Sequence, residues 1–321
     1  MSSAPSSQTP PDTTLNRRRF ISLAGCGAVT LALPALARAA GGGKLRFGVI
    51  SDLHCDVMHD AVARITAFLE AMRQAKPAFI VHLGDFSQPK PANLPFRGAW
   101  NRYDGPRYHV LGNHDMDGGF TREQVVAWLE MPARHYAFEQ GGVRFLVLDG
   151  NEPGGKTTGY ARFIAAAQRD WLEQQLESTR LPVVVLIHQP LESPNGIVNQ
   201  EEIRAILEKP RDADHPGVAT VFSGHFHQDY VVRIGGIAHV QINSASYVWL
   251  GSDRRAKVYD DATHTAFPVL DRVAPYHDPL WALVTLDLDA GTLTIQGRRS
   301  KWDGPDPWQR GAPESDYPRA K

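Results

Sequence analysis

Cysteine is scarce in this chain of 321 residues, which contains only Cys26 and Cys55. Because Cys26 lies in a segment that we expect to be removed, the remaining thiol has no partner for an internal disulfide, even in an oxidising compartment. An excess of positive charge is also missing, since 34 Lys and Arg residues face 35 Asp and Glu residues. Nucleic-acid-binding domains normally show a basic balance, so the charge argues against that class of function.

The N-terminal region lacks an apolar run long enough to span a membrane. Residues 21–36 are apolar, but this stretch is shorter than the roughly 20 residues that a spanning helix needs. Arg17 and Arg18 precede the stretch, and a small-residue cleavage pattern ends at Ala39. The pattern is typical of a twin-arginine signal peptide over residues 1–39. It predicts the twin-arginine export machinery as a partner and a periplasmic or secreted mature chain.

Two alternatives stay open for this N-terminus. Without cleavage, the same segment would anchor the chain to a membrane. Residues 23–26 also resemble a lipoprotein cleavage box, although most of the apolar stretch follows Cys26. If residues 1–39 are removed, four basic residues and one acidic residue leave with them, so 30 basic and 34 acidic residues remain and the net charge becomes −4.

The rest of the chain is long enough for one large domain, which we place at residues 44–300, with a Pro- and charge-rich tail at 301–321. Strands and helices alternate at first, and hairpins follow. Thr121 and Gln124 have the spacing of a capping box at a helix start, and Asn199 is a candidate cap for a later helix. Strands are expected at 45–50, 78–83, 108–111, 136–139, 143–148, 183–187, 218–222, 230–234, 237–242, 280–288 and 292–296, and helices at 60–75, 121–130, 164–176 and 199–207.

Polar side chains follow five of these strands, at the point where each strand ends. Ligand sites of open α/β sheets form beyond the carboxyl ends of strands, so these side chains are expected to converge on one site. They are Asp52 and His54, Asp85, Asn113 with His114 and Asp115, His188, and His225 with His227. The other histidines are read as structural or surface residues, with His82 the least certain of them because it lies only three residues before Asp85.

This ordered series resembles the calcineurin-like metallophosphoesterase family over residues 45 to about 250. The resemblance implies an α/β fold in which two mixed β-sheets pack as a sandwich flanked by helices. It also implies a site for two metal ions, with His114 facing the substrate. One metal would be bound by Asp52, His54, Asp85 and His227, and the other by Asp85, Asn113, His188 and His225.

The residue types fit that chemistry. Two cations about 3.5–4 Å apart can clamp the attacking and leaving oxygens of an in-line displacement at phosphorus. Two divalent ions, less the charges of Asp52, Asp85 and a bridging hydroxide, leave a net charge of +1 that attracts a phosphate ester. A shell rich in imidazole favours Mn, Fe or Zn, as divalent or trivalent ions, over Mg or Ca. His114 is expected to act as general acid, and Asp115 either orients His114 or caps the loop.

Other features narrow the prediction or leave it open. Purple acid phosphatases carry a metal-binding Tyr where this chain has Gln88, so a purple ferric centre is not expected. Cys55 follows His54 directly and is either a buried small residue or an oxidation-sensitive thiol. Residues 86–106 form either a rim that grips the substrate or a solvated cover. Residues 243–249 follow a strand and either line the pocket or pack beneath it.

We therefore expect an exported hydrolase of small phosphoric esters that uses metal-bound hydroxide. Whether the substrate is a monoester or a diester stays open, and so does the oligomeric state. The alternative is a non-catalytic module of the same fold that binds metal or phosphate. The complete series of predicted ligands and the presence of His114 favour the enzyme.

Overall fold

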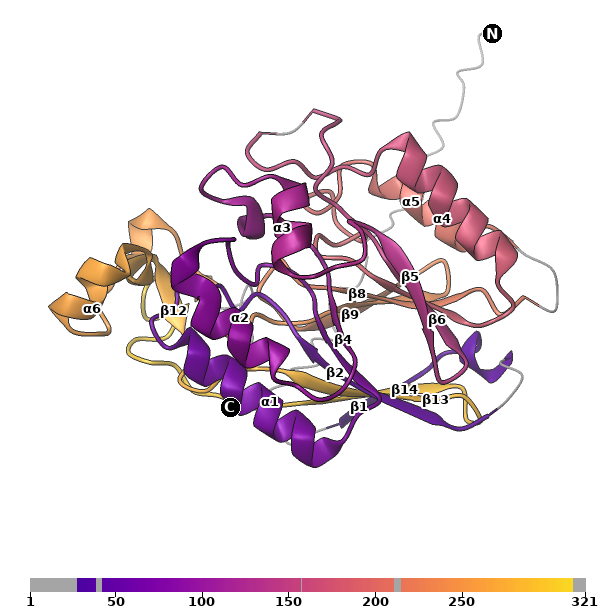
Figure 1. The fold of residues 1–321 in the computed structure, drawn as a ribbon, viewed down its shortest axis with the longest axis horizontal. Helices are drawn as coiled ribbons and strands as arrows, with labels where there is room; N and C mark the ends of the chain where they lie inside the picture. The colour runs from indigo at the N-terminus through magenta and orange to yellow at the C-terminus, as the bar shows by residue number, and fades with distance from the viewer. Residues whose placement is uncertain (1–27, 39–41, 157, 211–214, 314–321) are drawn as a thin grey trace, which may run out of the picture.

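The computed structural model describes residues 28–38, 42–156, 158–210 and 215–313. Two six-stranded mixed sheets face each other, and helices cover their outer sides (Figure 1). The strand order is β1-β14-β13-β2-β3-β4 in the first sheet and β5-β6-β7-β8-β10-β9 in the second. The predicted sandwich of two mixed sheets flanked by helices is confirmed.

The strands of the first sheet are β1 (Ala28–Ala32), β14 (Thr292–Gly297), β13 (Ala282–Asp287), β2 (Lys44–Ile50), β3 (Phe79–His82) and β4 (Arg107–His109). Those of the second are β5 (Tyr136–Gln140), β6 (Val143–Val147), β7 (Val183–Leu186), β8 (Val218–Ser223), β10 (Ile237–Gln241) and β9 (Tyr230–Ile234). A separate ribbon pairs β11 (Tyr247–Trp249) with β12 (Val273–Pro275). The α-helices are α1 (Ala61–Ala75), α2 (Leu94–Asn101), α3 (Arg122–Trp128), α4 (Ala166–Ser178), α5 (Gln200–Glu208) and α6 (Asp261–Ala266). Short 3₁₀ helices are η1 (Leu36–Arg38), η2 (Pro91–Asn93), η3 (His114–Met116), η4 (Ser252–Arg254) and η5 (Pro268–Arg272).

Aromatic side chains join the two sheets. The ring of Phe47 on β2 stacks on that of Phe79 on β3, with centroids 4.9 Å apart, and meets Phe145 of β6 and Phe222 of β8 edge-on. Alternate residues of the second sheet point the other way, toward α4 and α5, where a second apolar cluster forms. Central strands such as β3, β7 and β8 are therefore buried on two faces, which explains their largely apolar sequences.

The parallel strands all end at one edge of the sandwich. β2, β3 and β4 are parallel in the first sheet, and β6, β7, β8 and β10 are parallel in the second. Because side chains that follow parallel strands meet at the same edge, this topology brings distant sequence segments together.

The hydrogen bonds of the structure test the two helix caps predicted from the sequence. The capping box is confirmed, since the Thr121 hydroxyl accepts from the backbone N–H of Gln124 while the Gln124 side chain accepts from that of Thr121. Asn199 does stand at the N-cap of α5, but its side chain makes no cap hydrogen bond. It exchanges hydrogen bonds with the backbone of Ile164 instead, at 3.2 and 2.9 Å. A tertiary partner has replaced the local one.

Residues 86–106 contain η2 and α2, so the expected long loop is largely helical. The ring of Trp100 is buried between Phe68 and Phe86, with centroids 6.3 and 5.4 Å away. Arg97 pairs with Glu130 at 3.2 Å on the outer face. The helical part of the segment thus packs mainly against α1, and a contact of this segment with substrate stays a prediction.

The two ends of the chain pack onto the sandwich as far as they are described. β1 pairs antiparallel with β14 (Figure 1). Leu33 and Leu36, which follow β1, are fully buried. Arg17, Arg18 and Ala39 lie outside the described residues, so the export signal stays a prediction. At the other end Trp302 stacks on Tyr276, and residues 301–313 join the fold, whereas 314–321 lie outside the described part. None of the described helices is long and apolar enough to cross a bilayer.

Candidate metal centre

Seven predicted ligands lie together at the carboxyl edge of the parallel strands. Each follows a strand by two to four residues, and all but His225 are buried. They come from both sheets: Asp52 and His54 after β2, Asp85 after β3, Asn113 after β4, His188 after β7, and His225 and His227 after β8. Within the described residues, two groups of three have donor atoms within 4.8 Å of one another.

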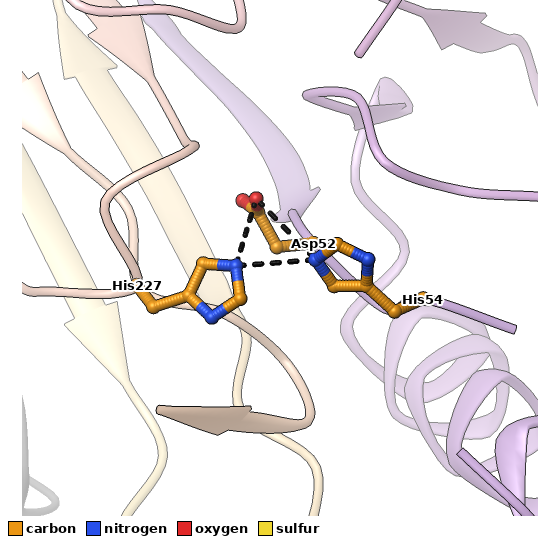
Figure 2. A group of neighbouring side chains, drawn as sticks. All are labelled: Asp52, His54 and His227. Carbon is orange, nitrogen blue, oxygen red and sulfur yellow. Dashed lines mark hydrogen bonds and ion pairs between the residues drawn. The ribbon is translucent and has the colours of Figure 1, made fainter. Parts of the chain in front are cut away.

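The first group consists of Asp52, His54 and His227 (Figure 2). The two Nε2 atoms lie 3.1 Å apart. Oδ1 of Asp52 is 3.3 Å from Nε2 of His227 and 3.9 Å from Nε2 of His54. Nitrogen and carboxylate oxygen are donor types that Zn and similar transition metals accept.

The second group consists of Asp85, His188 and His225. Nε2 of His188 lies 3.2 Å from Oδ2 of Asp85 and 3.2 Å from the amide oxygen of Asn113. The imidazole rings of His188 and His225 meet edge-on, with centroids 5.1 Å apart. Together with Asn113, this group therefore offers two imidazoles, one carboxylate and one neutral amide oxygen.

One carboxylate oxygen lies between the two groups. Oδ2 of Asp85 is 3.6 Å from Nε2 of His54 and 3.2 Å from Nε2 of His188. The other oxygen, Oδ1, accepts a 2.8 Å hydrogen bond from the backbone N–H of His114 and is thereby fixed. Asp85 can thus bridge two cations through Oδ2.

Backbone carbonyls set the ring tautomers of two histidines. Nδ1 of His188 donates to the Leu83 carbonyl at 2.8 Å, and Nδ1 of His227 donates to the Tyr247 carbonyl at 2.9 Å. A neutral imidazole whose Nδ1 carries the proton presents Nε2 as a lone pair, as metal ligation requires. Lone pairs from several residues therefore converge on a small buried space, which fits a cation.

The electrostatics agree with this donor set. Burial lowers the pKa of His54 and of His225 to about 3, which keeps both imidazoles neutral. Burial would also lower the pKa of His188, but the carboxylates of Asp85 and Asp52 outweigh it and raise that pKa to about 9. The carboxylates thus attract positive charge into the site, and a metal ion would supply it in place of the proton.

The backbone of the site is strained and tightly packed. Five of the ligand residues have positive φ angles between 49° and 75°, which are uncommon outside glycine and cluster at functional sites; they are Asp52, His54, Asp85, His225 and His227. Gly112 allows the strand ends to touch, because a Cβ atom there would lie 2.0 Å from the backbone nitrogen of Asp85.

The expectation that Asp115 orients His114 is wrong. The Asp115 carboxylate points back into the loop after β3, where it accepts hydrogen bonds from the backbone N–H groups of Phe86 at 2.6 Å, Ser87 at 2.9 Å and Gly112 at 2.9 Å. Burial, with Asp85 nearby, raises its pKa to about 7 against these donors. Asp115 is the loop cap that was its alternative interpretation.

The partners of His114 are two residues that the motif did not indicate. Nδ1 of His114 lies 2.6 Å from Oδ2 of Asp117 and 3.1 Å from the hydroxyl of Tyr160. The Tyr160 hydroxyl also donates to Oδ1 of Asp117 at 2.9 Å. Asp117 could have been found from its spacing of three residues, which places it on the same side of a helical turn. Tyr160 has no local signal, because it comes from a distant loop.

Two residues of the segment 243–249 contact the metal-binding residues from the inner side of the site. The Ser244 hydroxyl donates to the Asp52 carbonyl at 2.7 Å, and the Tyr247 ring stacks on His54 with centroids 5.0 Å apart. Burial raises the pKa of Cys55 to about 12, so its thiol stays protonated, and it contacts the Asn93 side chain at 3.5 Å. His82 is fully buried among aromatic rings and is a core residue.

Comparison with family models identifies the chain. Residues 45–229 match the model of the calcineurin-like phosphoesterases. The chain belongs to this family. Its members are phosphoester hydrolases that typically depend on two metals, and we assign the chain to that enzyme class.

A solved structure with a TM-score above 0.5 supports the fold. A dimetal phosphatase from Danio rerio is 13% identical, with a TM-score of 0.51, covering 74% of this chain and 95% of that one. GAP50, described as the anchor in the inner membrane complex of Plasmodium, is 16% identical over 76% of this chain and 81% of its own, with a TM-score of 0.49. A putative 5'-nucleotidase from Staphylococcus aureus, in complex with alpha-ketoglutarate, is 16% identical over 82% of this chain and 55% of its own, with a TM-score of 0.45. A search of curated proteins found no match.

Proposed function

We propose that this phosphoesterase family member hydrolyses small phosphoric esters with two metal ions held at the described edge of the sandwich. The observation that carries the proposal is the position of Asp85, whose Oδ2 lies between two groups of nitrogen and oxygen donors. One ion would be held by Asp52, His54, Asp85 and His227, and the other by Asp85, Asn113, His188 and His225. Mn, Fe or Zn fit this imidazole-rich donor set.

The cations, when bound, would acidify a water molecule and polarise the phosphoryl oxygens. The chain itself contributes charge balance, since Asn113 is neutral and leaves the site less negative than a third carboxylate would. The carboxylates of Asp52 and Asp85 are fixed by backbone N–H donors, from His225 and His114 respectively. The ligand oxygens are therefore held in place before substrate arrives.

His114 is the proposed general acid. Its Nδ1 is occupied by Asp117 and Tyr160, which leaves Nε2 as the ring nitrogen available to a substrate. A His side chain held in this way can give a proton to the departing alkoxide, a contribution of about 10²–10⁴ in rate. The His114 side chain is 41% exposed, so it can reach a bound ester.

A non-catalytic metal-binding module is the alternative, and the accessible His114 with its two partners argues against it. The test is to purify the chain, measure bound metal, and assay aryl phosphate monoesters and diesters with Mn supplied. Turnover that a chelator abolishes and Mn restores supports the proposal. Stoichiometric metal binding without turnover on a broad ester panel would favour the binding module. We further propose a periplasmic or secreted location, on the evidence of the twin-arginine pattern alone, which fractionation of expressing cells would test.

A further inference from the structure

A cavity of about 370 Å³ opens beside the metal centre. It borders the site directly, because the ligand Asn113 and the His114 partners Asp117 and Tyr160 belong to its wall. Its size falls within the range of small-molecule sites. Its other lining residues include Met116, Phe120, Arg122 and Glu123.

One wall of the cavity is apolar. Met116 and Phe120 are partly buried against the main core and so have fixed positions. The Tyr160 ring is 42% exposed and stands against the His114 ring, with centroids 4.8 Å apart. A ligand group that enters the cavity would therefore contact aromatic and thioether surface next to the proposed general acid.

Acidic side chains outnumber basic ones around this wall of the cavity. The guanidinium of Arg122, the one basic group among its lining residues, is paired with Asp149 at 2.8 Å and lies 3.8 Å from Glu152. Asp117 and Glu123 add two carboxylates to the wall; Asp117 is paired with His114 at 2.6 Å, and Glu123 lies 4.0 Å from Arg134. A carboxylate on the far side of the ligand's alcohol portion would meet these acidic groups, whereas the basic side chains near the wall already have acidic partners.

We propose that this cavity binds the alcohol portion of the phosphoric ester, and that it selects an alcohol with apolar or aromatic surface and without negative charge of its own. The inference rests on the proposed function. During hydrolysis the P–O bond to this alcohol breaks and a water oxygen forms the new P–O bond. The departing alcohol oxygen takes its proton from His114, the proposed general acid. Nucleoside polyphosphates and carboxylated alcohols are thus poor substrates.

A matched pair of substrates tests the selection. The Mn-loaded full chain is assayed with 4-carbamoylphenyl phosphate and 4-carboxyphenyl phosphate, which differ mainly in one negative charge. We expect kcat/KM to be about tenfold higher for the carbamoyl ester, the order of effect that charges several Å apart produce near a protein surface. Equal values, or a preference for the carboxylate, would overturn the inference.

Charge reversal inside and outside the cavity supplies the control. Glu123→Lys should reduce the difference between the two esters to about threefold or less, whereas Glu173→Lys, on the exposed face of α4, should leave the ratio as in the wild type. Phe120→Ala should lower kcat/KM for both aryl esters more than for ethyl phosphate. If Glu173→Lys shifts the ratio as much as Glu123→Lys does, the cavity is not the source of selection.

Failure of the proposed function has a different signature. If the metal-loaded chain turns over none of the three monoesters and no aryl phosphate diester either, the hydrolase proposal fails and this inference with it. If it turns over all three and the carboxylate and carbamoyl esters react equally, the hydrolase stands and only the role of the cavity is refuted.

Discussion

Oδ2 of Asp117 lies 2.6 Å from Nδ1 of His114, across one turn of η3. This carboxylate fixes the ring and favours the tautomer with a proton on Nδ1. Asp117→Asn keeps the shape of the side chain but removes its charge, so we expect kcat to fall about tenfold while metal content and KM change little. Loss of metal from this variant, or an unchanged kcat, would contradict the positioning role.

Asp85 and His114 should separate metal binding from proton transfer. Asp85→Ala removes the oxygen shared by both donor groups, so we expect loss of bound metal together with activity. His114→Ala removes a side chain that is not assigned as a ligand, so metal should remain while kcat falls about 10²–10⁴-fold. Elemental analysis after dialysis, paired with rate measurements, distinguishes the two. If His114→Ala lost its metals, this division of roles would be wrong.

Gly112 is required by a close approach of two strand ends. An added Cβ would lie 2.0 Å from the Asp85 nitrogen and 2.2 Å from its Oδ1. Gly112→Ala should therefore lower the free energy of unfolding by about 3 kcal/mol or more, the upper end of overpacking effects, and weaken metal binding. Gly98→Ala is the matched control, because its nearest neighbour would be 3.7 Å away within α2. We expect Gly98→Ala to stabilise the protein by about 0.5–1 kcal/mol in urea unfolding.

His109 should make the protein sensitive to acid. Burial, with Arg107 nearby, lowers its pKa from 6.5 to about 3. The folded state therefore keeps His109 neutral, whereas the unfolded chain takes up a proton below pH 6.5. Relative to its value above pH 6.5, the free energy of unfolding therefore decreases as the pH falls from 6.5 toward 3. At pH 5 the decrease is about 2 kcal/mol.

The variant His109→Phe removes this titration from the aromatic cluster that His109 shares with Phe86 and Trp100. Urea unfolding of chelator-treated protein between pH 5 and 7 should show a shallower loss of stability for the variant. Parallel curves for the two proteins would show that His109 does not couple folding to protons.

The fold and the cluster of ligands could be predicted because their signals are local. Buried strands such as β7 show continuous apolar runs, and the polar residues directly after them, such as His188, need only the strand topology to converge. What sequence could not supply depends on tertiary contacts. Asp115 and Asp117 are both acidic neighbours of His114, and only the path of the loop decides that Asp115 turns inward. Similarly, Asn199 has a cap-forming side chain whose hydrogen bonds go to Ile164.

Helix α2 and the contact of Tyr160 with His114 are two further features that local sequence patterns do not predict. α2 contains Pro95 and Gly98, which weaken any helical pattern, yet burial of Trp100 against α1 stabilises the helix. Tyr160 reaches His114 from a segment 46 residues away, a pairing without periodic or motif signal.

The pairing of β1 with β14 has a consequence for processing. β1 belongs to the segment that the export signal would remove, and it is joined to β14 through five residue pairs. Cleavage after Ala39 would release that strand from the covalent chain and leave the β14 backbone able to accept another strand. It would also uncover the core positions occupied by Leu33 and Leu36. Cleavage would then leave β14 as an unpaired edge strand. Either a second copy of the protein or the cleaved peptide, if it stayed bound, could pair with that edge.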